Sequence, residues 1–391
     1  MKQRVFGVAA IAAGVVFLGS CGGNAPSQAP TTSQLTRRAF VSNEFSGNIQ
    51  IANAANDTLN SHTIPVGTNP QTLAISQNKA KAVIFNAGGN LLMFVDNATE
   101  VVTHTANLAG YTDSLAISSD GTKAYAAIRN APSSTGTPLG VVTFLNSTTG
   151  VVTSVDVPLA RRLVLSPSGS KLLVFSDNSD SVTVIDEATR AVTVVPFPAG
   201  SRPAWGVFST DSSKAYIMNC GPECGGTTAS VTELDNVAAA PTLGTNTPVS
   251  AATTGLLDGT NLYVAGTVTA GAGGGRLDVL NAGTLAVTQS GVVINDGYHT
   301  TMAISNGHLF VGARACSNVA EGCLSIYSSS GAATIGTPKG EVTGMQAISG
   351  RMRVYVIEGG ELRIYDSSTS TEVLPAPIDI VGKAWDVKTV D

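Results

Sequence analysis

Lys171 to Ser209 reads KLLVFSDNSDSVTVIDEATRAVTVVPFPAGSRPAWGVFS, and this stretch is the clearest copy of a unit that recurs along the chain. Four short runs rich in Val, Ile, Leu and Phe (LLVFS, SVTVID, AVTVVPF and WGVFS) predict four strands. The segments between them, SDNSD, EATR and AGSRP, are rich in the Asp, Asn, Ser, Gly and Pro that form turns. Four short antiparallel strands in about forty residues predict one blade of a β-propeller.

The same unit recurs eight times between residues 39 and 391. Its second strand supplies one anchor in each copy: Phe40, Val83, Tyr125, Leu173, Tyr216, Tyr263, Phe310 and Val354. The first copy lacks an inner strand, whereas Ala384 to Val390 (AWDVKTV) forms one that has no following partner. We therefore expect the C-terminal strand to complete the first blade, which removes an exposed sheet edge.

These repeats predict an all-β fold, a single eight-bladed propeller of four-stranded blades over residues 39–391. The alternative is seven blades and an irregular segment, and the repeat near 252–257 is the weakest match. Charged residues make up only 13% of the chain, and no long apolar stretch with helical periodicity follows the N-terminus. The formal charge of −5 argues against nucleic acid as a partner, because phosphates need a basic surface.

The N-terminus predicts an exported lipoprotein. MKQR is basic, residues 5–19 are apolar, and Leu18-Gly19-Ser20-Cys21 resembles the bacterial lipobox. We expect a signal peptide over 1–20, lipidation of Cys21 and a flexible tether over 21–38, with the membrane reached through the lipid. The residue after Cys21 is not Asp, so by resemblance to the enterobacterial pathway a host with two membranes would send the protein to the outer one. The alternative is an ordinary signal peptide or an uncleaved anchor.

Several segments resemble a known repeat family. AFVSN at 39–43 and AYIMN at 215–219 are similar to the YVTN motif, and SVTVIDEATRAVTVVPFPAGSRP and IPVGTNPQTLAIS are similar to the rest of that repeat. The chain resembles the YVTN-type β-propeller superfamily over about residues 39–390, and this superfamily includes lactonase-like members. The resemblance implies the propeller fold. Lactonase-like members usually have seven blades, so the eighth blade departs from their pattern.

The five Cys have separate roles. Cys21 is the predicted lipidation site, and the other four form two local pairs, Cys220 with Cys224 and Cys316 with Cys323. In an exported protein such pairs predict disulfides. Both pairs fall between the second and third strands of their blades, so we expect them to hold loops. The rival interpretation, a redox or metal site, has neither a CxxC motif nor a nearby His to support it.

The loops between second and third strands are enlarged at 130–140, 219–229, 266–275 and 313–322. In a propeller these loops share one face with the links between blades, so the sequence predicts an elaborated rim that could bind a protein or glycan. Neutral variation of loop length is the alternative.

The links between blades should surround a central funnel on the same face. They carry charged and aromatic side chains, namely Tyr111, Asp113, Arg161, Arg162, Arg202, Trp205, Tyr298, His299, Glu341, Lys383 and Trp385. The concave centre is the default ligand site of such a fold, so this set predicts a site for an acidic small molecule, a glycan or a peptide. Alternatively, the Arg and Lys residues stabilise turns and the Trp residues pack between blades.

Motifs for catalysis and cofactors are absent from the sequence. It contains no GxSxG, HExxH, CxxCH or DxDxDG motif, and His299 is the only one of four His near the predicted funnel. We therefore expect no metal and no cofactor, and a monomer that acts as a binding scaffold for a protein or cell-envelope ligand. The alternative function is an exported lactonase-like hydrolase in which His299, Arg161 and Arg202 stabilise an oxyanion. A cofactor-dependent dehydrogenase finds no support in the sequence.

Overall fold

The computed structural model describes residues 32–132, 140–269, 272–317, 322–335 and 339–391. The chain divides into Met1–Thr31 and a compact unit, Thr32–Asp391. The expected signal peptide, Cys21 and the first part of the expected tether lie outside the described residues. Within them, no helix is long and apolar enough to cross a membrane.

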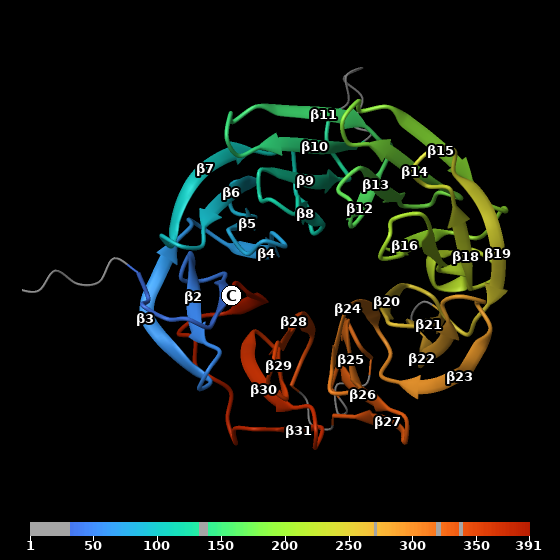
Figure 1. Ribbon diagram of the computed structural model, residues 1–391. Coiled ribbons are helices and arrows are strands. Elements are labelled where there is room, and N and C mark those ends of the chain that lie inside the picture. The colour runs from blue at the N-terminus through green and yellow to red at the C-terminus, as the bar shows by residue number, and fades with distance from the viewer. Residues whose placement is uncertain (1–31, 133–139, 270–271, 318–321, 336–338) are drawn as a thin grey trace, which may run out of the picture. The chain divides into compact units, whose positions relative to one another are not determined.

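Eight four-stranded antiparallel sheets form a ring in Thr32–Asp391 (Figure 1). The first four blades are blade 1, with β1 (Arg38–Asn43), β2 (Asn48–Asn53), β3 (Thr58–Pro65) and β32 (Ala384–Thr389); blade 2, with β4 (Pro70–Ile75), β5 (Lys81–Asn86), β6 (Leu91–Asp96) and β7 (Val101–Asn107); blade 3, with β8 (Leu115–Ile117), β9 (Lys123–Ile128), β10 (Val141–Asn146) and β11 (Val152–Asp156); and blade 4, with β12 (Ala160–Leu165), β13 (Lys171–Ser176), β14 (Ser181–Asp186) and β15 (Val192–Pro196).

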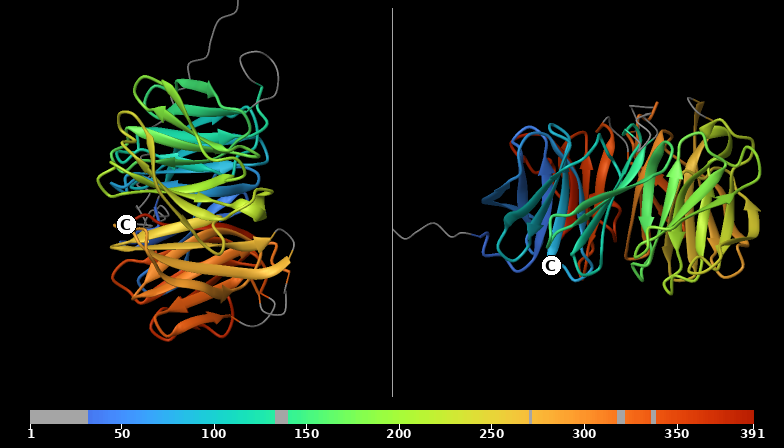
Figure 2. Two further views of the ribbon diagram at one scale, coloured as in Figure 1. Left: turned by 90° about the vertical axis from the view of Figure 1, so that its right-hand side faces the viewer. Right: turned by 90° about the horizontal axis from the view of Figure 1, so that it is seen from above.

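The other four blades continue around the ring, seen edge-on in Figure 2. They are blade 5, with β16 (Pro203–Phe208), β17 (Ala215–Asn219), β18 (Ser230–Asp235) and β19 (Thr242–Pro248); blade 6, with β20 (Thr254–Asp258), β21 (Asn261–Thr269), β22 (Ala272–Asn281) and β23 (Val287–Ile294); blade 7, with β24 (Tyr298–Ser305), β25 (His308–Arg314), β26 (Leu324–Ser328) and β27 (Gly331–Thr334); and blade 8, with β28 (Val342–Ile348), β29 (Arg353–Glu358), β30 (Glu361–Asp366) and β31 (Thr371–Glu372). One short 3-10 helix, η1 (Gly221–Cys224), follows β17.

The eight-bladed prediction is confirmed, and the seven-bladed alternative is wrong. The C-terminal strand closes the ring as expected, because β32 pairs with β1 in the register Ala39↔Thr389 and Val41↔Val387. The termini of the ring are also joined by an ion pair between Arg38 Nη2 and Asp391 Oδ1 at 2.6 Å.

The hydrophobic core lies between neighbouring blades rather than in one centre. In β5, Val83 and Phe85 pack toward blade 3, whereas Ala82 and Ile84 pack toward blade 1. Successive strand residues point to opposite faces of a sheet, so an uninterrupted apolar run buries both faces. Eight such clusters alternate with the eight blades, which lets 391 residues fold without one oversized core.

The similar sequences at the ends of the third strands have a common structural role. In five blades an Asp or Asn side chain accepts a hydrogen bond from the backbone N–H three residues later, in the pairs Asp96 with Thr99, Asn146 with Thr149, Asp186 with Thr189, Asn281 with Thr284, and Asp366 with Thr369. The following residue in each turn has a positive φ, as Gly150 does at 68°. A short acceptor side chain therefore fixes the turn that starts each outer strand.

The last residues assigned to the tether contact the ring. Ser33 is buried, and its backbone N–H donates to Glu100 Oε2 at 2.5 Å. Arg38 Nη1 lies 2.8 Å from Glu100 Oε1, and the side chain of Glu100 is fully buried. The chain thus enters the ring between blades 1 and 2.

A candidate anion-binding funnel

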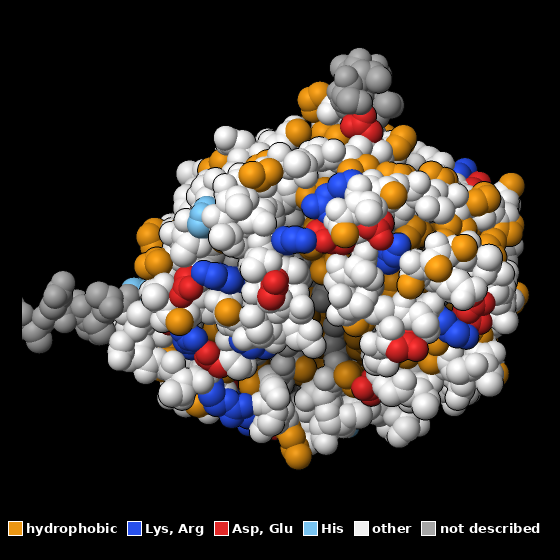
Figure 3. All heavy atoms as spheres, turned by 45° about the horizontal axis from the view of Figure 1, so that its top comes forward, with side chains coloured by type: hydrophobic (Ala, Val, Ile, Leu, Met, Phe, Trp, Pro, Cys, Tyr) orange, Lys and Arg blue, Asp and Glu red, His pale blue; other side chains and the backbone are white. Residues whose placement is uncertain are grey.

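A cavity of about 240 Å³ lies on the axis of the ring and is lined by seven of the eight blades. Its charged and aromatic side chains come from the inner strands, from the link before β8 and from the end of β25, and they are Asp113, Arg162, Trp205, Arg314, Trp385, Asp386 and Lys388. The opposite face of the ring, at which the inner strand β32 ends, also carries Lys and Arg side chains interspersed with Asp and Glu around a central hollow (Figure 3). Four of the predicted funnel residues, Asp113, Arg162, Trp205 and Trp385, therefore share this central cavity.

Arg162 has the most unusual environment in the funnel. It is 7% exposed, and among the described Lys and Arg residues no other is buried. Its guanidinium carbon lies 5.5 Å from the Trp205 ring centroid and 4.8 Å from that of Tyr298, within cation–π range. Nη1 donates a long hydrogen bond to the Thr253 carbonyl at 3.4 Å. No described Asp or Glu oxygen lies within 4.0 Å of it, so this cation is buried without a paired carboxylate.

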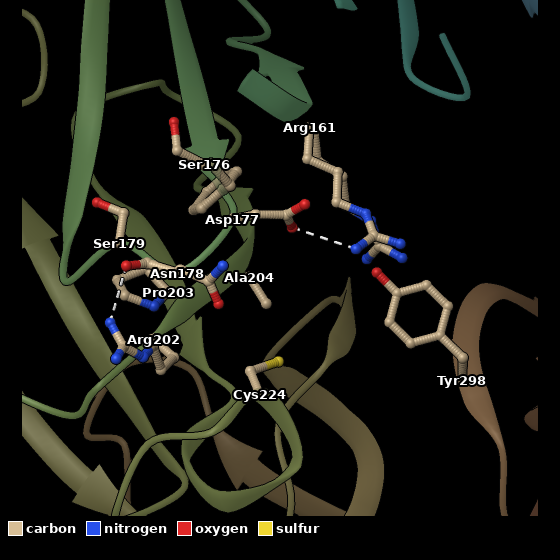
Figure 4. A pocket seen from close by; sticks show the side chains of 12 residues that line it. Arg161, Ser176, Asp177, Asn178, Ser179, Arg202, Pro203, Ala204, Cys224 and Tyr298 are labelled. Atoms are coloured by element: carbon tan, nitrogen blue, oxygen red, sulfur yellow. Dashed lines mark hydrogen bonds and ion pairs between the residues drawn. The ribbon is translucent and has the colours of Figure 1, made fainter. Parts of the chain in front are cut away.

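Arg161, the neighbour of Arg162 in β12, is paired with a carboxylate of this chain. Its Nη1 donates to Asp177 Oδ1 at 3.1 Å, and Arg129 Nε lies 2.5 Å from the other oxygen of Asp177. Its guanidinium also lies 5.1 Å from the Tyr298 ring centroid. In Figure 4 the side chains of Arg161 and Tyr298 point toward one another over a second cavity, of about 70 Å³.

Arg202 lines this second cavity from blade 5, and Cys224 faces the same space. Arg202 Nη1 donates to the Asn178 carbonyl at 2.9 Å and lies 3.4 Å from Asp180 Oδ2. The structure thus brings three of the predicted funnel residues, Arg161, Arg202 and Tyr298, to one cavity. The charge of Arg202 is already compensated by Asp180.

Across the funnel, Trp385 lies between two cations. Arg314 and Lys383 are 4.9 and 5.4 Å from its ring centroid. Lys383 Nζ lies 2.6 Å from Glu44 Oε2, and Arg314 Nε lies 3.7 Å from Glu341 Oε2. Lys383, Trp385 and Glu341 are therefore connected as a group through Arg314.

Sequence reasoning missed Arg314 and Lys388. Both lie on strands rather than in the links between blades, at the end of β25 and in β32. Arg314 is the last residue of β25, the second strand of blade 7, at the end of the funnel where the links between blades lie, which we call the mouth. Its position at the end of a second strand was the one signal that could have identified it.

Tyr111 and Asp113 lie in the link from blade 2 to blade 3. They share a cavity of about 220 Å³ with Arg129 and Arg161. Tyr111 is 48% exposed, and its hydroxyl donates to Gln71 Oε1 at 3.1 Å. Burial of the rest of the side chain, together with the nearby carboxylate of Asp113, raises the pKa of Tyr111. This hydroxyl therefore stays protonated at neutral pH, with its proton donated to Gln71.

His299 does not join the other funnel residues. It is 1% exposed in β24, and Nε2 donates to the Asn295 carbonyl at 2.9 Å. Burial lowers its pKa to about 4, so the ring is neutral at neutral pH. The oxyanion role that the hydrolase alternative gave to His299 therefore has no exposed imidazole to perform it.

The two predicted disulfides are present. Cys220 is bonded to Cys224 and Cys316 to Cys323, with Cα–Cα distances of 5.6 and 5.7 Å. Both follow the second strands of blades 5 and 7, as expected. Disulfides persist in oxidising compartments, so they indicate that this chain is exported.

The disulfide loop of blade 5 also reaches Arg162. Glu223, in η1, accepts hydrogen bonds from Thr253 Oγ1 and from the Thr267 N–H at 2.8 Å. The carbonyl of the same Thr253 accepts from Arg162. Burial raises the pKa of Glu223, and these hydrogen bonds and the charge of Arg162 oppose that shift. A chain of contacts therefore runs from the disulfide through Glu223 and Thr253 to the unpaired guanidinium.

Of the four segments expected to form enlarged loops, one lies completely within the described residues. Segment 219–229 contains η1 and is fully described, whereas parts of 130–140 and 313–322 lie outside the described residues. Segment 266–275 is mostly strand, because β21 and β22 extend to Thr269 and from Ala272. The segment that was expected as a loop therefore consists mostly of the paired strands of a hairpin.

The chemistry available in the funnel is recognition of negative charge next to aromatic surface. Among the described residues no group of three His, Cys, Asp or Glu side chains could hold a metal ion. Guanidinium groups bind carboxylates and phosphates through paired N–H donors, and their flat faces stack on aromatic rings.

Comparison with known proteins identifies the fold alone. No family model and no curated protein matches the sequence. Dihydro-heme d1 dehydrogenase NirN, solved in complex with DHE, superposes with a TM-score of 0.67 and 13% identity over 93% of this chain and 76% of its own. The periplasmic gluconolactonase PpgL of Pseudomonas aeruginosa gives 0.56 and 15% over 91% and 99%. Hydrazine synthase of Kuenenia stuttgartiensis gives 0.53 and 15% over 84% and 91%. These structures include lactonase-like and other β-propellers.

Proposed function

We propose that this chain is a lipid-anchored, non-catalytic envelope propeller that binds an anionic ligand in its funnel. The observation that carries the proposal is Arg162, a guanidinium buried between Trp205 and Tyr298 with no paired carboxylate among the described residues. Removing an ion from water costs free energy unless a counter-charge compensates it. A carboxylate or phosphate of a ligand supplies that counter-charge at this position.

Tryptophan fluorescence tests the proposal directly. The chain has only two Trp, Trp205 and Trp385, and both line the central cavity. We expect one or more of benzoate, gluconate, phosphate and dodecanoate to change the emission of residues 22–391. Arg162→Gln should weaken binding about 10- to 100-fold, since hydrogen bonds to charged groups contribute about 1.5–3 kcal/mol.

Arg190→Gln is the matched control. Arg190 also stacks on an aromatic ring, with its guanidinium 3.9 Å from the Phe144 centroid, but it is already paired with Glu187. Its substitution should leave the titration unchanged. A silent panel, or equal binding by Arg162→Gln and the parent, would contradict the proposal.

An exported lactonase-like hydrolase is the second candidate. Its support is the likeness of fold to the gluconolactonase PpgL. Incubation of residues 22–391 with gluconolactone and with simple esters decides between the two candidates. Turnover that Arg161→Gln or Arg202→Gln abolishes would favour the hydrolase, whereas binding without turnover favours the scaffold.

The anchor and the rim complete the proposal. We infer that Cys21 is lipidated and that the rim at 219–229 and 313–322 offers a further surface to a protein or glycan of the envelope. Cys21→Ser should release the monomeric protein from the membrane fraction or leave an uncleaved precursor. Unchanged mass and unchanged membrane localisation would refute lipidation. Cross-linking from the two rim segments would identify a partner.

A further inference from the structure

We propose that the funnel ligand is an amphiphile with one anionic head group, held with its carboxylate or phosphate head at Arg162 and its apolar body deeper in the channel. This inference rests on the proposed anion-binding function and adds the class of ligand. It follows from a difference between the two ends of the central channel.

The inner strands run from the mouth of the channel toward its other end. Arg161 and Arg162 lie at the start of β12 and Leu165 lies at its end. The ends of β4, β8 and β12 surround a further cavity of about 380 Å³, which we call the lower chamber, with Ile75, Ile117 and Leu165 among its lining residues. None of the residues that line this lower chamber is charged.

The two chambers meet at side chains that they share. Leu115, Leu163 and Trp205 line both the central cavity of about 240 Å³, which contains Arg162, and the lower chamber. Trp205 also stacks on Arg162, so one face of the indole adjoins the cation and the ring continues into apolar surface. A ligand whose head pairs with Arg162 would therefore place its next atoms against Trp205 and Leu163.

The charge inventory of the mouth favours a single anionic group. The other cations near the axis have acids of this chain beside them: Arg314 is paired with Glu341, Lys383 with Glu44 and Lys388 with Asp386, and Arg161 shares Asp177 with Arg129. Arg162 alone lacks such a partner among the described residues. A polyanion would have to displace these pairs, whereas one head group needs only Arg162.

Apolar side chains that face the lower chamber supply the second half of the recognition. Ile75, Leu115 and Leu165 are only partly buried, although they belong to inner strands. Burial of an apolar body removes this surface from water, and each buried methylene strengthens binding by up to about fourfold. Affinity that rises with chain length is therefore the signature of this binding mode.

A titration of straight-chain probes tests the inference. Hexanoate, octanoate, decanoate and dodecanoate, kept below their micelle concentrations, are added to residues 22–391 while Trp fluorescence is recorded. We expect affinity to rise at each step and dodecanol to bind at least tenfold more weakly than dodecanoate. Dodecyl phosphate, compared with dodecanoate, distinguishes a phosphate head from a carboxylate head.

Two variants separate the two halves of the ligand. Arg162→Gln should weaken all four alkanoates by a similar factor and keep the dependence on length. Leu165→Thr should flatten that dependence and leave hexanoate nearly unaffected. Val194→Thr, at a valine that is 59% exposed on the outer strand β15, is the control and should change neither property.

The outcomes show whether the amphiphile inference fails alone or together with the proposed anion-binding function. If benzoate or citrate binds in an Arg162-dependent manner and alkanoate affinity is flat with length, the amphiphile is wrong and the anion-binding function stands. If dodecanol binds as tightly as dodecanoate, the head-group role of Arg162 is wrong. If no anion binds the parent protein, both proposals fail together.

Discussion

His299 is buried as a neutral side chain, and this has a consequence for stability. Its Nε2–H is used by the Asn295 carbonyl, whereas Nδ1 is buried without a partner among the described residues. Protonation would place an unpaired cation in the interior, which is why burial lowers its pKa to about 4 from a usual value near 6.5. In the unfolded chain the same ring titrates near the usual value.

We predict that His299 makes the fold acid-sensitive between about pH 6.5 and pH 4. In that window the unfolded chain binds the proton and the folded chain does not, so stability falls as pH falls. The loss attributable to this residue is about 3 kcal/mol by pH 4. Urea unfolding of the parent and of His299→Gln at pH 7 and pH 4.5 measures it. Gln can keep the hydrogen bond to Asn295, and equal pH dependence in the two proteins would show that His299 is not the cause.

The funnel shows how far residue-level prediction reached. The sequence located Arg161 and Arg162 together in a link near the axis, because blade periodicity fixes which residues end there. It could not distinguish their roles, since Asp177 comes from the turn after β13 and pairs with Arg161 but not with Arg162. The same limit explains His299, where alternation along β24 faces the ring into the interior and Tyr298 toward the pocket.

At the scale of elements, the disulfide loop of blade 5 supports the site from outside. The Cys220–Cys224 bridge encloses η1, which presents Glu223 to Thr253 and Thr267 of blade 6. Thr253 is fully buried and accepts from Arg162 through its carbonyl. The loop therefore supports the carbonyl that accepts a hydrogen bond from the guanidinium of Arg162.

We predict that Cys220→Ser/Cys224→Ser weakens anion binding more than it destabilises the fold. A loop this short contributes only about 2 kcal/mol through chain entropy, so the ring should still unfold cooperatively. Glu223→Ala in the disulfide-bonded chain should reproduce the loss of binding. Glu233→Ala is the control, because it removes an acid of β18 that is paired with Lys214. Dodecanoate titration and urea unfolding measure the two effects, and unchanged binding in the double variant would contradict the role of the loop.

Elements were easier to predict than their irregular connections. Strand order and the placement of both disulfides followed from the repeat, because five blades reuse the same turn chemistry, as Asp186 and Thr189 show. The hairpin of blade 6 was expected as a loop, since its Gly-rich sequence carries no strand signal. Cross-strand pairing extends it nonetheless, with Thr267 opposite Gly275 and Thr269 opposite Ala272.

At the scale of the whole molecule, closure depends on two segments far apart in sequence. Strand β32 completes blade 1, and Val387 is fully buried between it and blade 8. The backbone N–H of Arg38 and its side chain both bind the carboxylate of Asp391. The sequence predicted this closure because the first repeat lacks an inner strand and the C-terminus supplies one that has no following partner. It could not predict that Arg38 also pairs with Glu100 of blade 2, which depends on how the blades sit in space.

We predict that the ring tolerates a new order of its blades as long as β32 remains. Because Arg38 and Asp391 are in contact, a linker of about four residues can join residue 391 to residue 38 as a β-hairpin. Opening the chain between β3 and β4 then builds every blade from contiguous sequence. This permutant keeps every strand pairing, so its free energy of unfolding should stay within about 1 kcal/mol of the parent.

A chain that ends at Lys383 provides the opposite case. It lacks the inner strand of blade 1, so it exposes the edge of β1 and the core around Val41, and it should aggregate or fail to unfold cooperatively. Urea unfolding and size-exclusion chromatography compare the parent, the permutant and the truncated chain. A stable, monomeric truncated chain would mean that β32 is dispensable. A permutant that fails to fold would mean that the ring depends on chain order, because every strand pairing of the closed blade is preserved in it.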